Sequence, residues 1–82
     1  RASFRGADLS HASMWHADCK DACFDNAIME ETDMDFCYLE GATFRDARVK
    51  KTIFPINRVS MSQINASVKS GRKLSMDRTR ME

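Results

Sequence analysis

With 82 residues and a net charge of +1, the chain is the size of one small domain, without the basic excess of nucleic-acid-binding proteins or a strongly acidic balance. It contains no apolar run long enough to cross a bilayer, so we expect no membrane span. Its three cysteines lack the spacing of a disulfide framework, which favours a reducing compartment, and we expect a cytoplasmic location.

From Ala2 to Phe54 one pattern recurs every five residues: a small residue is followed two positions later by an apolar one. This period fits neither an α-helix nor a strand, because a helix would rotate successive apolar residues by about 140° around its cylinder. The pattern therefore predicts an all-β solenoid, in which each pentad points one small and one large side chain inward before the chain turns.

The large side chains of the eleven pentads form the predicted core ladder. Its members are Phe4, Leu9, Met14, Cys19, Phe24, Met29, Met34, Leu39, Phe44, Val49 and Phe54. Three pentads depart from alanine at the small position, which is occupied by Thr32, Cys37 and Thr52. These substitutions are close enough in volume for the solenoid to accommodate them.

The segments ADLSH, ACFDN and ATFRD, which begin at Ala7, Ala22 and Ala42, resemble the A-D/N-L-x-x unit of pentapeptide-repeat proteins. The resemblance covers about two thirds of the chain. It implies a right-handed quadrilateral parallel β-helix with four pentads per coil, and thus about three coils here. We expect the repeat to occupy residues 1–57 and to continue upstream in a larger parent protein.

Charged residues support a coil of twenty residues, because residues at that separation lie one above the other. The outward charged pairs twenty apart are all opposite in sign: Arg5 with Asp25, Asp25 with Arg45, Lys20 with Glu40, Glu30 with Lys50 and Glu31 with Lys51. The same register stacks Phe4, Phe24 and Phe44 on one wall. A separation of fifteen residues would instead bring like charges together.

Residues 58–71 are predicted to form a C-terminal capping helix. The helix spans about Met61 to Ser70, with Ser60 as its N-cap and Gly71 at its end. Met61, Ile64 and Val68 would form a stripe that covers the last coil. Residues 72–82 have few apolar side chains and are predicted to be a flexible basic tail or linker.

One group of outward residues differs from the rest of the surface and is a possible protein-contact patch: His11, Trp15, His16, Asp35 and Phe36. The register places Phe36 above His16 and Asp35 above Trp15. Exposed aromatic residues one coil apart are typical of contact sites. The alternative is that a flanking domain or the C-terminal tail covers them.

No catalytic, cofactor or metal site is expected. A metal site made from His11, His16, Cys19 and Cys23 conflicts with the coil, because the two histidines fall at successive corners and Cys19 points inward. A nucleophilic pair between Cys23 and a histidine would join different walls and lacks a third orienting group. We therefore expect no enzyme activity and no cofactor.

Three functions remain open at this point. The first is a non-catalytic protein-binding or scaffold module, whose partner is a protein or an adjacent domain; a homodimer through the C-terminal segment is also open. The resemblance suggests the second, a DNA mimic that modulates a type II topoisomerase in the manner of quinolone-resistance proteins. The third is the repeat domain of a bacterial effector enzyme whose catalytic part lies elsewhere. Binding of nucleic acid is not expected.

Overall fold

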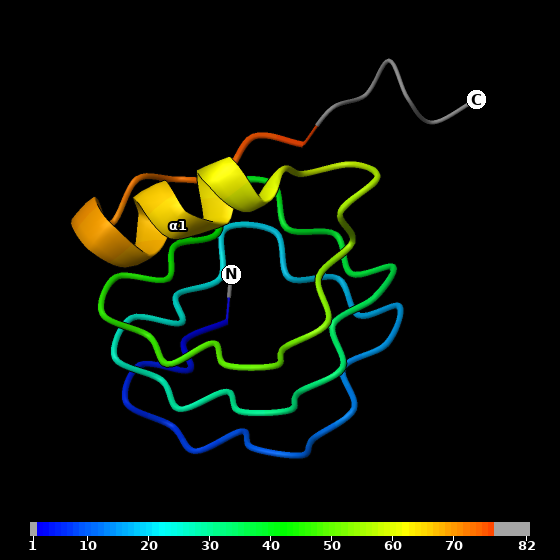
Figure 1. Cartoon of the computed structure of the whole chain (residues 1–82), viewed down its shortest axis with the longest axis vertical. Helices are drawn as coiled ribbons and strands as arrows, with labels where there is room; N and C mark the ends of the chain where they lie inside the picture. The colour runs from blue at the N-terminus through cyan, green and yellow to red at the C-terminus, as the bar shows by residue number, and fades with distance from the viewer. Residues whose placement is uncertain (1, 77–82) are drawn as a thin grey trace.

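The computed structural model describes residues 2–76, and Figure 1 shows the chain winding through stacked coils with one helix lying across their end. Seven isolated parallel bridges join residues twenty apart, from Ser3 with Cys23 to Asp33 with Ile53. These bridges confirm the predicted period of twenty residues. The described residues contain no extended strand, because each pentad contributes one bridging residue before the chain turns again.

Two backbone hydrogen bonds flank each bridge in a repeating pattern. Phe4 N–H donates to the Cys23 carbonyl at 2.7 Å, and Cys23 N–H donates back to the Ala2 carbonyl at 3.0 Å. The same pair of bonds recurs one coil higher, where Phe24 N–H donates to the Thr43 carbonyl at 2.9 Å. Each wall of a coil is therefore attached to the next by its own short ladder.

Every corner of the coil has the same local conformation. The residue two positions after each of the first ten apolar centres has a positive φ, from Gly6 at 70° to Lys51 at 59°. The amide of the next residue closes the turn, as when Ala7 N–H donates to the Phe4 carbonyl at 3.0 Å. A positive φ at the third residue is the mark of a type II turn. This turn brings the next small residue inward again.

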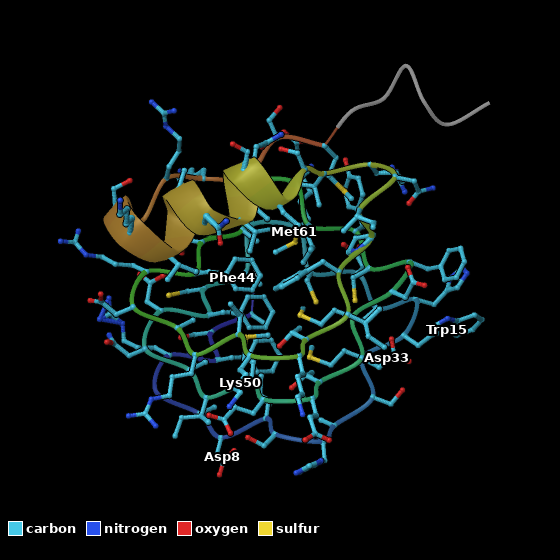
Figure 2. All side chains as sticks on the ribbon, in the orientation of Figure 1. Asp8, Trp15, Asp33, Phe44, Lys50 and Met61 are labelled. Carbon is cyan, nitrogen blue, oxygen red and sulfur yellow. The ribbon has the colours of Figure 1, made fainter. Side chains whose placement is uncertain are left out.

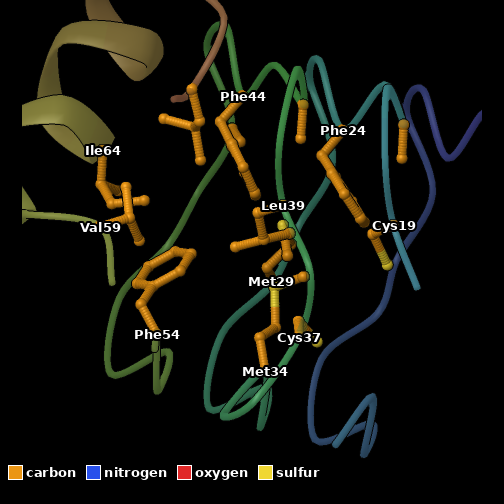
Figure 3. Close-up of a cluster of buried hydrophobic side chains, with 14 of the residues drawn as sticks. Cys19, Phe24, Met29, Met34, Cys37, Leu39, Phe44, Phe54, Val59 and Ile64 are labelled. Carbon is orange, nitrogen blue, oxygen red and sulfur yellow. The ribbon is translucent and has the colours of Figure 1, made fainter. Parts of the chain in front are cut away.

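The core consists of the apolar centres stacked inside the coils (Figure 3). Phe4, Phe24 and Phe44 lie face to face, with ring centroids 5.0 Å and 4.8 Å apart and planes within 8° of parallel. Phe54 meets Phe44 edge-on at 5.7 Å. Burying each such ring is worth about 1.5–3 kcal/mol, so this stack is a main source of stability.

Burial of the ladder depends on position along the stack. The centres of the second coil are fully buried: Phe24, Met29, Met34 and Leu39. Phe4, Leu9 and Met14 of the first coil pack against this core but are only partly buried, as is Val49. A centre is therefore fully covered where described coils or the helix lie on both sides of it.

The three departures from alanine share one structural role. Thr32 Oγ1 donates to the Leu9 carbonyl at 2.8 Å, and Cys37 Sγ donates to the Met14 carbonyl, also at 2.8 Å. The Thr52 hydroxyl likewise donates to the carbonyl of the residue 23 positions earlier. Each side chain thus hydrogen-bonds to the coil below while occupying an inward position.

The predicted helix is present as α1, Met61–Ser70. The Ser60 hydroxyl accepts a hydrogen bond from Gln63 N–H at 3.2 Å, and Gly71 ends the helix with φ 76°. No helix within residues 2–76 is long and apolar enough to cross a membrane.

Helix α1 packs through a face that differs from the predicted stripe. Ile64 and Ser67 are fully buried and Val68 packs against the core, whereas 44% of Met61 is exposed. The inclusion of Met61 in the buried stripe was therefore wrong. Ser67 lies on this buried face instead, where its hydroxyl accepts a hydrogen bond from the backbone N–H of Phe44 in the last coil.

The polar groups left open by the last coil bond to the C-terminal segment. Gly41 N–H donates to the Leu74 carbonyl at 2.9 Å, and Leu74 N–H donates to the Ala42 carbonyl at 2.9 Å. Asp46 N–H donates to the Val68 carbonyl at 2.9 Å. These bonds matter because a buried amide without an acceptor costs more than the bond itself contributes.

The prediction of a flexible tail from residue 72 is therefore wrong for residues 72–76. Leu74 and Met76 are buried at 2% and 4% exposure, and Met76 N–H donates to Glu40 Oε1 at 2.9 Å. The Met76 sulfur also accepts from Leu39 N–H at 3.1 Å. Residues 77–82, including Met81, lie outside the described residues.

Candidate functional site

One corner of the coils carries the exposed aromatic side chains. Trp15 and His16 occupy the two central positions of one turn, and Asp35 and Phe36 occupy the same positions one coil later. His16 N–H donates to the Asp35 carbonyl at 3.1 Å, which joins the two turns. We call these four residues the aromatic corner.

The three rings of the aromatic corner contact one another. The Trp15 ring lies 4.6 Å from the His16 ring and 5.5 Å from the Phe36 ring, which it meets at 75°. The rings of His16 and Phe36 stack at 5.6 Å with planes 20° apart, as the register predicts. These contacts leave 55% of Trp15 and 53% of Phe36 exposed, and Figure 2 shows Trp15 extending away from the coils.

The backbone of the aromatic corner does not require aromatic residues. Phe36 has φ 62° and His16 has φ 69°, a left-handed conformation that costs a bulky residue about 1–3 kcal/mol. Glycine and asparagine adopt it more readily, and other corners contain Gly6, Gly41 and Asn26. The turn therefore does not explain why aromatic rings are placed here.

Two carboxylates stand beside the rings. Asp33 Oδ1 accepts a hydrogen bond from Asp35 N–H at 3.0 Å, and Asp35 Oδ1 accepts one from Phe36 N–H at 3.0 Å. Neither carboxylate forms an ion pair with another residue in the part of the chain that the structure describes. This side of the coil is therefore both aromatic and negatively charged.

His11 does not belong to the aromatic corner. It lies at the preceding corner, where its Nδ1 is 3.6 Å from Glu31 Oε1. Five residues along the chain lead to the next corner of the coil, as the register predicts, so His11 lies one corner before Trp15 and His16; its part in a contact patch stays a prediction. Glu31 correspondingly pairs with His11 rather than with Lys51.

Two further exposed apolar residues come from the last turn of the chain around the coil. Ile53 lies directly above Asp33 through a bridge and is 52% exposed, and Ile56 is 66% exposed. The predicted contact patch included neither of them: Ile53 belongs to the last pentad, and Ile56 lies beyond the repeat. Ile56 lies twenty residues after Phe36, and this separation is the sequence signal that could have indicated its place near the aromatic corner.

A shallow cavity of about 300 Å³ lies at a different corner. Its lining residues are Asp21, Ala22, Cys23, Gly41, Thr43 and Lys73. Within residues 2–76 no group of three or more His, Cys, Asp or Glu side chains is arranged to hold a metal ion.

Asp25, at another corner of the coil, is held by local bonds to the coils on both sides. Asp25 Oδ2 lies 3.7 Å from Arg5 Nη2, and Asp25 Oδ1 accepts from Arg45 N–H at 3.0 Å. Partial burial works to raise the pKa of Asp25, but hydrogen bonds from Thr43, Arg45 and Cys23 lower it below its ordinary value overall. The predicted charge ladder is thus present in part: Arg5 forms an ion pair with Asp25, whereas Arg45 contacts Asp25 through its backbone N–H.

Comparison with known protein families gives a match to Pentapeptide repeats, in eight copies over residues 2–35 and 17–54. The matched residues are the ones that form the coils and carry the aromatic corner. Comparison with curated proteins and with solved structures gives no match.

Proposed function

This chain belongs to the pentapeptide-repeat family, and we propose that it is a non-catalytic protein-binding or scaffold module of a larger protein. We propose further that its coils form the right-handed quadrilateral β-helix that the family implies. The observation that supports binding is the aromatic corner, where Trp15 and Phe36 stay more than half exposed at positions that do not need aromatic residues.

Exposed rings of this kind favour contact with a protein. Covering an aromatic side chain is worth about 1.5–3 kcal/mol, and tryptophan and phenylalanine are enriched at the centres of interfaces. A contact that buried Trp15 and Phe36 together would remove both exposed rings from water. The partner is a separate protein or an adjacent domain of the parent.

The coil holds this surface rigidly before binding. His16 N–H donates to the coil above at the corner itself, and on the adjoining wall Met34 N–H donates to the Ile53 carbonyl at 2.8 Å. Because the backbone is attached on both sides, little conformational freedom is lost when a partner docks. A scaffold function needs the same rigidity.

The cytoplasmic location stays a prediction. The thiols of Cys19 and Cys37 are free and buried inside the coils, and Cys23 is free and partly exposed. Three free cysteines suit a reducing compartment.

Site-directed photocrosslinking in the parent protein tests binding at the aromatic corner. A photoreactive phenylalanine analogue replaces Phe36 in one variant and Asn26 in the control. Asn26 occupies the same turn position with the same φ of 62°, but at another corner. We expect a discrete adduct from position 36 and none from position 26.

A second substitution, Trp15→Ser, should abolish the adduct from position 36 while the protein stays folded by circular dichroism. Binding at this corner is refuted if position 36 gives no adduct, or if both positions give the same one. Separately, a DNA supercoiling assay tests the DNA-mimic alternative, for which inhibition by the purified chain is the supporting result.

A further inference from the structure

The aromatic corner offers ring faces of negative potential to solvent. The rings of Trp15 and Phe36 meet at 75°, so they touch edge to face and do not cover each other completely. The face of an aromatic ring carries the negative part of its quadrupole and attracts cations within about 6 Å. A positively charged group is therefore favoured beside these rings.

The neighbouring carboxylates strengthen that preference. Asp35 belongs to the aromatic corner, and Asp33 lies above Ser13 on the adjoining wall. In each carboxylate one oxygen accepts a backbone N–H, and the other has no hydrogen-bond donor among residues 2–76. An apolar partner would bury these charges without compensation, and an anionic partner would repel them.

We propose that the aromatic corner binds an arginine side chain of the partner protein, with the guanidinium against Trp15 and its N–H groups directed at Asp35. The inference rests on the proposed function, since it names the chemistry of the partner at that same corner. A guanidinium is planar, stacks on ring faces and donates two parallel hydrogen bonds to a carboxylate. The ammonium of lysine is a more strongly hydrated point charge and stacks less well.

The residues beyond the corner indicate what flanks the arginine. Ile53, which lies above Asp33, is half exposed and apolar. A partner segment that places arginine at the aromatic corner and continues across the adjoining wall, over Asp33, would meet Ile53 next. We therefore expect an apolar residue beside the arginine in the partner.

Titration with short peptides tests the preference for arginine. The probe is acetyl-Leu-Arg-Leu-amide, and the control replaces arginine with citrulline, which is neutral but of nearly the same shape. Trp15 is the one tryptophan of the chain, so its fluorescence reports on this corner alone. At low salt we expect the arginine peptide to bind about three- to tenfold more tightly than the citrulline peptide.

Isosteric variants separate charge from structure. Asp35→Asn keeps an oxygen that accepts the Phe36 N–H but removes the charge, and it should clearly reduce the preference for arginine. Asp8→Asn is the control for loss of a surface carboxylate elsewhere, because Asp8 lies on another wall and its Oδ1 also accepts a nearby backbone N–H, that of Ser10, at 3.0 Å. This control should bind both peptides as the unchanged chain does.

The proposal is overturned if arginine and citrulline peptides bind equally, if neither changes the fluorescence, or if Asp35→Asn keeps the preference. These outcomes are distinct from failure of the proposed function. If a partner is crosslinked from position 36 and Asp35→Asn does not change its capture, the contact site is supported and the arginine proposal is rejected. Absence of any adduct would remove the contact site itself.

Discussion

The backbone N–H of Phe44 donates a hydrogen bond at 2.9 Å to the hydroxyl of Ser67, and both residues are fully buried. One coil lower, the equivalent amide of Phe24 donates to the Thr43 carbonyl at 2.9 Å. A side chain of α1 thus takes the place of the backbone of a further coil. This replacement lets the stack end in a helix without leaving a buried donor unpaired.

Replacing Ser67 with alanine should therefore destabilise the protein by about 1–3 kcal/mol, because the Phe44 amide would lose its acceptor in the core. Urea denaturation measures the change. Thr32→Val is the control, since Thr32 is equally buried. Its acceptor, the Leu9 carbonyl, keeps the hydrogen bond from Ala12 N–H at 3.0 Å, so the loss should stay below about 1 kcal/mol. Equal losses in the two variants would contradict this account of the cap.

Two glycines at corner positions should respond differently to alanine. Gly6 has φ 70° with no atom near the site of a Cβ, so Gly6→Ala should cost only the left-handed strain, about 1 kcal/mol. Gly41 has φ 79°, and a Cβ there would collide with Asp21 Oδ1. Gly41→Ala should cost more, and adding Asp21→Ala should reduce the loss to that of Gly6→Ala. Thermal unfolding of the three variants checks this. If the double variant unfolds at the same temperature as Gly41→Ala, the collision with Asp21 is refuted.

Phe36→Asn should change stability by less than about 1 kcal/mol, because the relief of left-handed strain offsets the loss of ring contacts. The same variant should lose partner binding at the aromatic corner. Denaturant unfolding together with a binding assay separates the two effects. A large loss of stability would mean that the ring serves the fold rather than a partner.

Acid should weaken the fold through Asp25. Its pKa is lower in the folded protein than in the unfolded chain, so the unfolded chain binds the proton more tightly. The contribution of Asp25 is therefore present above its unfolded pKa, about 4, and is lost as the pH falls through the folded value. Melting temperatures should decline below about pH 4, and the decline should be shallower in Asp25→Asn. Parallel curves for both proteins would contradict this assignment.

The cysteines should differ in reactivity. Two effects raise the pKa of Cys37 well above its ordinary value: chiefly a hydrogen bond with the Cys19 thiol, and secondly burial. The Cys37 thiol therefore stays protonated and unreactive. Cys23 is partly exposed. Iodoacetamide at neutral pH should label Cys23 in the folded protein and all three thiols in urea, as peptide mass spectrometry will show. Modification of Cys37 before unfolding would be inconsistent with the described core.

Local pattern was enough to predict the repeat. The small and apolar pair in every pentad identified the inward residues, and the twenty-residue separation placed Phe4, Phe24 and Phe44 in one stack. Ser60 and Gly71 likewise marked the ends of the helix. These features depend on near neighbours or on an unbroken period, and such information is present in the sequence.

The closure of the last coil was decided only in three dimensions. Ser67, Leu74 and Met76 are buried because the amides of Phe44, Gly41 and Leu39 need acceptors there, a demand from residues more than twenty positions away. The pairing of Glu31 with His11, where the sequence suggested Lys51, was likewise decided by the folded structure. The sequence by itself thus determined which side chains face inward, whereas the tertiary structure decided how the open edge is capped, because unpaired buried hydrogen-bonding groups arise only after the coils have stacked.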